Sequence, residues 1–335
     1  MHLTYLLRRQ AWARVALTLA SFLAAGFAAP SSFAQESYPS RPVTLVVGFS
    51  AGGQSDILAR KLAARLGPML GGSIVVVNKE GAASTMGARF VAEAKPDGYT
   101  LLLGGCSGIV MAPLVMKVTY DPLKDFRSIA MLTRQSQAIA VHPSVPANNL
   151  KELIALIKAN PGKYSYATGG VGGSDHLTAE LFAQIGGDLK MLHVPYKGGA
   201  PAMSAVIGGQ VPIVITALSG IYPNWKAGQI RLLAVTSSKR ASMAPEIPTA
   251  EEAGLPMVAE ACNFLTAPAK TPTAVVDTLK SAMTRLMADP GFAAEIVAMG
   301  SEPVPESTPE STDAYIRNEI EKWRKVVVKA NITAN

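Results

Sequence analysis

Two glycine-rich segments, each placed between a short apolar run and a helical pattern, are the features that most constrain this chain. The first covers residues 48–56 and follows the apolar run 43–47, and the second covers residues 168–176 and follows 164–167. A helix start leaves backbone N–H groups without intrahelical partners and carries the positive end of the helix dipole. Glycines let that backbone come close to a ligand. The pattern therefore predicts two anion-binding turns that hold one small carboxylate from opposite sides.

Short apolar runs of strand length alternate with helical patterns along most of the chain. Strands are expected at residues 43–47, 74–77, 99–103, 138–141, 164–167, 191–194, 211–215, 232–235 and 264–267. Helices are expected at residues 57–70, 86–94, 150–159, 177–185, 203–207, 275–287 and 313–329. Such alternation favours an α/β fold built from mainly parallel sheets flanked by helices. For the first helix, Ser55 or Asp56 is the expected N-cap.

The order of these elements indicates two lobes. The last helical patterns need a sheet to cover, and the first set of strands has few helices, so we expect the tail to pack onto the first lobe. The chain then crosses between lobes near residues 134–137 and 260–263. The predicted division is a signal peptide at 1–34, lobe 1 at 35–137 plus 262–335, and lobe 2 at 138–261.

The N-terminus has the composition of an export signal. Arg8, Arg9 and Arg14 precede an apolar stretch at residues 15–27, and Ser32-Phe33-Ala34 supplies a small-x-small cleavage site. The stretch is shorter than the roughly 20 residues of a membrane span. These features predict a soluble periplasmic protein, with Sec or twin-arginine export left open.

Charge and motif content argue against several classes of protein. The formal net charge is +7, and three of the basic residues lie in the expected signal peptide. Without basic runs interleaved with aromatic residues, nucleic acid is not an expected partner. Neither glycine turn matches a dinucleotide or Walker fingerprint, and no zinc-binding spacing occurs. We therefore expect no cofactor and no metal.

The two cysteines leave an enzymatic alternative open. Cys106 and Cys262 either pair or stay as buried free thiols, and the free thiols are slightly preferred. The segment Gly104-Gly-Cys-Ser-Gly108 is similar to a nucleophile elbow with cysteine as the nucleophile, and histidines follow at 142, 176 and 193. A secreted thiol hydrolase that uses Cys106 is therefore the alternative function.

The candidate ligand contacts lie mainly in the two glycine turns. The first turn contributes Phe49, Ser50, Ala51, Gly52, Gly53, Ser55 and Asp56, and the second contributes Thr168, Gly169, Gly172, Gly173, Ser174 and His176. Ser84 and Thr85 are expected either to cap a helix or to contact the ligand, and Tyr196 to form a wall of the cleft. Asp175 is expected to cap its helix rather than to contact the ligand. Asp56, if it faces the cleft, would accept from a ligand amino group.

Several of these segments together resemble the Bug receptors, the periplasmic solute-binding proteins of tripartite tricarboxylate transporters. The matching segments are residues 38–47, 51–56, 78–82, 96–102, 173–177, 194–199, 232–236, 247–249 and 252–254. The resemblance covers nearly all of the chain after the signal peptide. Gly48 and Ser50 depart from it, because the family often has proline there, and Ala83-Ser84 replaces a pair that usually contains glycine.

The resemblance implies a two-lobed, type II periplasmic binding protein that closes on its ligand and is not an enzyme. A ligand carboxylate would be held by backbone amides at 49–56 and 168–176. The ligand would be a di- or tricarboxylate, an amino acid or an aromatic acid. The expected partners of this monomer are the membrane components of a tripartite tricarboxylate transporter or a sensor protein.

Overall fold

The computed structural model describes residues 38–333. The expected signal peptide, residues 1–34, lies outside this range, as do residues 35–37 and 334–335. Within residues 38–333, no helix combines the length and the apolar character that a membrane span requires.

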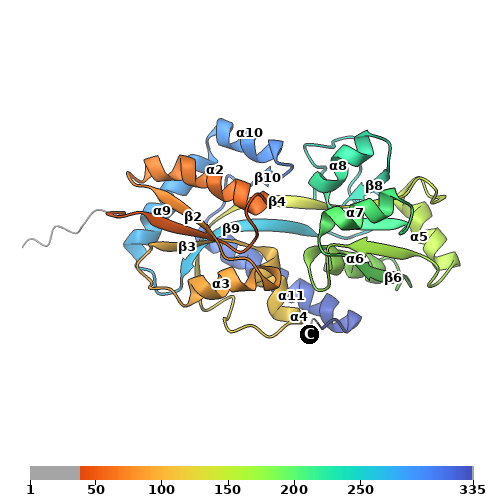
Figure 1. The fold of residues 1–335 in the computed structure, drawn as a ribbon, viewed down its shortest axis with the longest axis horizontal. Helices are drawn as coiled ribbons and strands as arrows, with labels where there is room; N and C mark the ends of the chain where they lie inside the picture. Colours follow the sequence, from red (N-terminus) through yellow and green to blue (C-terminus); the bar gives the residue numbers. More distant parts are fainter. Residues whose placement is uncertain (1–37, 334–335) are drawn as a thin grey trace, which may run out of the picture. The chain divides into compact units, whose positions relative to one another are not determined.

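Ten strands of the described region form one hydrogen-bonded network, in the order β2-β1-β3-β9-β4-β7-β5-β6, with β8 and β10 also paired to β4 (Figure 1). The bounds are β1 Val43–Val47, β2 Ile74–Asn78, β3 Thr100–Gly105, β4 Phe126–Val141, β5 Ser165–Thr168, β6 Leu192–Pro195, β7 Ile213–Ala217, β8 Arg231–Val235, β9 Glu260–Pro268 and β10 Glu302–Pro303. All nine expected strands are present. The two-residue β10 is too short to produce a sequence pattern.

The α/β fold class is confirmed, and the sheet is mixed. Strand β1 pairs in parallel with β2 and β3, and β5 pairs in parallel with β6 and β7, as expected for each half. Strand β9 is antiparallel to β3 and β4, and β4 is antiparallel to β7 and β8. The antiparallel pairs arise because β4 and β9 link the two parallel sets.

Strand β4 is much longer than the sequence pattern indicates. It pairs with β9 as far as Ser136, and from Gln137 onward it pairs with β7. Apolar residues alone predict only residues 138–141, because polar side chains such as Thr133 and Arg134 interrupt the preceding run. That run is nevertheless largely buried, and helices of the C-terminal part pack on it.

The helices flank this network. They are α2 Gln54–Met69, α3 Thr85–Ala92, α4 Ala112–Val115, α5 Leu150–Ala159, α6 Ser174–Ile185, α7 Gly199–Ile207, α8 Leu218–Lys226, α9 Thr273–Met287, α10 Pro290–Ala298 and α11 Pro309–Ala330, with a 3₁₀ turn at Ala82–Ser84 and a π-helix at Cys106–Met111. The patterns predict neither the short α4 nor α8 and α10. Gly220 and Pro223 weaken the helical pattern of α8. Asp289 caps α10 by accepting a hydrogen bond from Phe292 N–H.

Cys106 and Cys262 form a disulfide, so the preference for free thiols was wrong. Their Cα atoms are 5.3 Å apart, although 156 positions separate them in sequence. Strands β3 and β9 are hydrogen-bonded neighbours, with Gly105 opposite Asn263, and this pairing brings the two cysteines together. Long-range strand pairing of this kind leaves no local signal in the sequence.

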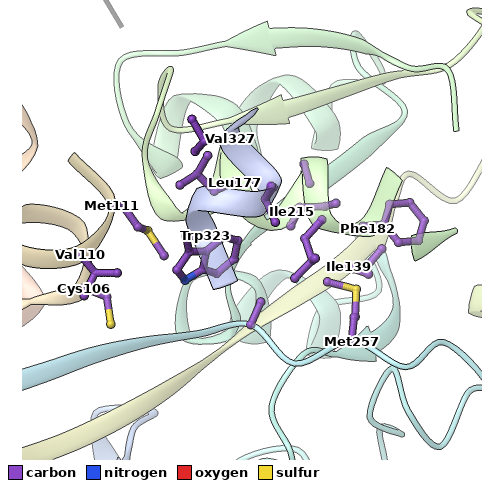
Figure 2. Close-up of a cluster of buried hydrophobic side chains, with 14 of the residues drawn as sticks. Cys106, Val110, Met111, Ile139, Leu177, Phe182, Ile215, Met257, Trp323 and Val327 are labelled. Carbon is purple, nitrogen blue, oxygen red and sulfur yellow. The ribbon is translucent and has the colours of Figure 1, made fainter. Parts of the chain in front are cut away.

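The C-terminal helices pack in two ways. Helix α9 contacts α2 and β4, as the expected return of the tail to the first strands requires. Helix α11 contacts the π-helix and α4, but it also contacts α6. Figure 2 shows its Trp323 between Val110 and Met111 on one side and Leu177 and Ile215 on the other. One apolar cluster therefore joins segments from both halves of the chain.

Trp323→Ala should lower the free energy of unfolding by about 3–5 kcal/mol, the usual cost of deleting a large buried aromatic side chain. Trp323 is fully buried, and its Nε1 donates to Glu319 Oε2 at 2.8 Å. Urea denaturation followed by circular dichroism measures the change. Val328→Ala, at a position of the same helix that is 74% exposed, should change stability by less than about 0.5 kcal/mol. Equal effects of the two substitutions would contradict the central role of Trp323.

Candidate ligand-binding site

The first glycine turn joins β1 to α2, and hydrogen bonds to the Asp56 side chain stabilise it. The Asp56 carboxylate accepts from Gly52 N–H at 2.9 Å, from Arg60 at 2.9 and 3.0 Å, and from Asn78 Nδ2 at 2.9 Å. Hydrogen bonds from Arg60 and Gly52 lower the pKa of Asp56 to about 2. Gly53 is the N-cap, so Ser55 and Asp56 lie in the first helical turn instead of at the expected cap position. Asp56 therefore orders the turn, and its acceptor oxygens are occupied by the protein.

The second glycine turn joins β5 to α6 and is held by two side chains of the first helical turn. His176 Nδ1 accepts from Gly172 N–H at 3.1 Å, and Asp175 Oδ2 accepts from Gly169 N–H at 3.3 Å. Asp175 Oδ2 also accepts from Thr216 Oγ1 at 2.9 Å. The positive φ of Gly172, +74°, is a conformation that glycine adopts without strain.

A stack of three rings supports this second turn. The His193 ring lies between those of His176 and Tyr166, with centroids 4.0 and 4.9 Å away. His193 Nε2 lies 2.6 Å from Thr168 Oγ1 at the end of β5. The facing Glu180 lies 3.8 Å from His176 Nε2 and accepts from the Tyr166 hydroxyl. Burial lowers the pKa of both histidines to about 4, so their neutral forms maintain these contacts near pH 7.

A cavity of about 190 Å³ lies where the two turns meet the linking strands. Its lining comes from the starts of α2 and α6, the ends of β3 and β7, and the middle of β4 and start of β9. The lining residues are Phe49, Gln54, Ser55, Gly105, Cys106, Ser107, Gln135, Gln137, Ser174, Asp175, Ala217, Ala261, Cys262 and Asn263. Ligands of α/β proteins commonly bind at such strand ends, so this cavity is the candidate site. Larger hollows at α6 and α11 lie away from the first glycine turn.

Three predicted contacts, Phe49, Ser55 and Ser174, line this cavity. Residues 51–53 form the exposed tip of the first turn, and Ser50 donates a hydrogen bond to the Glu80 carboxylate. Other predicted residues lie in or behind the turns without lining the cavity: Asp56, Thr168, Gly169, Gly172, Gly173 and His176. Their role as ligand contacts remains a prediction.

Ser84, Thr85 and Tyr196 also lie outside the cavity lining. Ser84 is the N-cap residue of α3, but its side chain makes no capping hydrogen bond. It lies against Gly48, where an added Cβ would overlap Ser84 Oγ. Gly48 and Ser84 are thus in contact, and the absence of a Cβ at Gly48 leaves the space that Ser84 fills. Tyr196 N–H donates to Thr168 O and its side chain packs at the edge of an apolar cluster.

Sequence reasoning missed most of the cavity wall. Gln135, Gln137 and Asn263 lie within the expected crossings, and a period-two pattern places Gln135 and Gln137 on one face of β4. Cys106 and Ser107 belong to the segment that is similar to a nucleophile elbow. Asp175, expected only to cap its helix, lines the cavity as well.

Comparison with known proteins gives a clear family relationship. Residues 58–332 match the model of the tripartite tricarboxylate transporter family receptor. A UPF0065 protein of Bordetella bronchiseptica is 37% identical over 304 residues, which is 90% of this chain and 89% of the relative. Protein BugT of Bordetella pertussis is 33% identical, over 94% of this chain and 96% of its own.

Solved structures agree with the fold. A protein of R. palustris, solved with adipate, is 33% identical with a TM-score of 0.78 and covers 88% of this chain and 99% of its own. MatC of Rhodopseudomonas palustris, solved with bound malate, is 30% identical with a TM-score of 0.74 and covers 87% of this chain and 100% of its own.

Protonation of His176 and His193 should destabilise the fold as the pH falls from about 6.5 to about 4. The folded histidines His176 and His193 have a pKa of about 4, below the ordinary value of 6.5, so the unfolded chain binds more protons in this interval. Urea denaturation at several pH values measures how steeply the free energy of unfolding changes with pH. His176→Gln retains an acceptor for Gly172 N–H and should flatten the slope. Equal slopes for the wild type and His176→Gln would refute the assignment.

Proposed function

The chain belongs to the tripartite tricarboxylate transporter receptor family, and we propose that it captures a small carboxylate in the periplasm for a membrane transporter of that type. The observation that carries this proposal is the cavity that both glycine turns reach, lined by Ser55 of one turn and Ser174 of the other. Relatives solved with adipate and malate support a carboxylate as the ligand.

Backbone amides and hydroxyls of the two turns would bind the ligand carboxylate. Hydrogen bonds to a charged group contribute about 1.5–3 kcal/mol each, so a few of them are enough for capture. In the proposed division, residues 35–137 with 262–335 form one lobe and 138–261 the other. The change of partner in β4 after Ser136 supports this boundary. Closure of the lobes would follow from tighter binding to the closed form.

The disulfide separates this proposal from the hydrolase alternative. A cysteine nucleophile acts as a thiolate, and Cys106 is bonded to Cys262. The disulfide also suits the oxidising periplasm that the proposed signal peptide implies. We further propose that the receptor is a monomer and delivers its ligand either to the transporter's membrane components or to a sensor protein.

Carboxylates should raise the melting temperature of the chain that starts at Gln35. A ligand at about 100 times its Kd adds about 2.7 kcal/mol of stability, which corresponds to a shift of roughly 4 °C for a chain of this length. Thermal-shift screening with adipate, malate, amino acids and aromatic acids measures this.

Two alanine-to-phenylalanine substitutions test whether the ligand binds in this cavity. Ala217→Phe, at the end of β7, should fill the cavity and abolish the shift. Ala159→Phe, at the exposed end of α5, should preserve it. If no carboxylate shifts the melting temperature while an uncharged solute does, the proposed function is wrong.

A further inference from the structure

The cavity that would receive an anion has an acidic wall. Among the described residues that line it, Asp175 is the one charged side chain, and neither lysine, arginine nor histidine contributes. A second carboxylate on the ligand would meet no cationic side chain, and the ionised form of Asp175 would repel it. The charge of this wall is better matched by a ligand that carries a positive group as well as a carboxylate.

One oxygen of Asp175 retains the capacity to accept hydrogen bonds. Its Oδ2 accepts from Thr216 Oγ1 at 2.9 Å and from Gly169 N–H at 3.3 Å. Its Oδ1 has only the Ser174 hydroxyl, at 3.5 Å, which is at the limit of hydrogen bonding. Burial raises the pKa of Asp175, and a nearby cation would offset the cost of keeping the carboxylate charged.

Gln137 supplies a second, independent acceptor in the same cavity. It is 2% exposed, and its Oε1 is buried without a hydrogen-bond partner. A buried polar atom without a partner destabilises the fold, so a ligand donor that pairs with Gln137 Oε1 would be favoured. The other two side-chain amides of β4 and β9 have partners within the protein. Gln135 Nε2 donates to Gln54 Oε1 at 2.8 Å, and Asn263 Nδ2 donates to Thr133 Oγ1 at 3.1 Å.

Strand pairing places the two acceptors on one wall. Asp175 accepts from Thr216, and the next residue along β7, Ala217, is the register partner of Gln137 on β4. Asp175, Ala217 and Gln137 all line the cavity. The wall thus presents acceptors, whereas the glycine turns present donors.

We propose that Asp175 and Gln137 bind an ammonium group of the ligand, so that the site selects small amino carboxylates over di- and tricarboxylates. This inference rests on the proposed function and names the ligand class of the same cavity. An ammonium group has three N–H donors, enough for Asp175 Oδ1 and Gln137 Oε1 together. The carboxylate of the same ligand would reach the amides of the turns, and a volume of about 190 Å³ limits the ligand to a small molecule.

Matched ligand pairs test the proposal by isothermal titration calorimetry of the chain that starts at Gln35. The pairs are alanine with propionate, aspartate with succinate, and glutamate with glutarate, which differ only in the amino group. At least one amino acid should bind about tenfold or more tightly than its deaminated partner. If a deaminated acid binds as tightly as or more tightly than its amino acid in every pair that binds, the inference is overturned.

Substitutions at Asp175 assign the preference to this residue. Asp175→Asn keeps the shape of the side chain and should weaken amino-acid binding about tenfold or more, while the deaminated acid binds equally well or better. Asp277→Asn, at an exposed position of α9, is the matched control and should change neither affinity. An unchanged ratio of the two affinities in Asp175→Asn would overturn the role of Asp175.

Gln137→Leu gives a readout that a purely structural role would not produce. Removing the unpartnered Oε1 should leave the melting temperature of the ligand-free protein unchanged or raise it, and should weaken amino-acid binding several-fold. A lower melting temperature with unchanged affinity would overturn the role of Gln137. If neither member of any pair binds, and the wider carboxylate screen is also negative, the proposed function itself fails.

Discussion

Backbone hydrogen bonds along β4 are the constraint on which the candidate site depends. One uninterrupted strand pairs with β9 up to Ser136 and with β7 from Gln137 onward, so both parallel sets are fixed to the same backbone. Alternate residues of a strand share a face, and Gln135 and Gln137 therefore both point to the cavity where the partner changes. The glycine turns meet there because the strands that precede them belong to the same network.

Side chains support the backbone of both turns, and in the proposed function the remaining amides bind the ligand. Asp56 and His176 each accept a hydrogen bond from an amide of the turn that precedes their own helix. An anion site made of amides needs no basic side chain, since the helix start already carries partial positive charge. Such a site recognises a carboxylate in general. Discrimination among carboxylates then falls to the few side chains that complete the cavity, which in this chain include an acid and an amide.

Local patterns were sufficient to predict the nine strands, most helices and the two turns, because each of these features is encoded by neighbouring residues. They were not sufficient for the start of β4, where polar residues are buried by helices from the far end of the chain. The Cys106–Cys262 pair and the wall formed by Gln137 and Asp175 depend on strand register, which joins residues far apart in sequence. The contact of Asp56 with Asn78 at the end of β2 also depends on the fold, whereas its contact with Arg60 joins residues four apart in one helix.

Helix α11 has a consequence for how such a receptor can open. It contacts the π-helix, whose first residue Cys106 lines the cavity, and it also contacts α6, which follows the second glycine turn. A rotation that separates the two turns must therefore slide apolar side chains around Trp323 past one another, because packed interfaces change between discrete arrangements. In the proposed closure of the lobes, the packing around Trp323 would therefore favour only those arrangements in which its apolar neighbours repack completely.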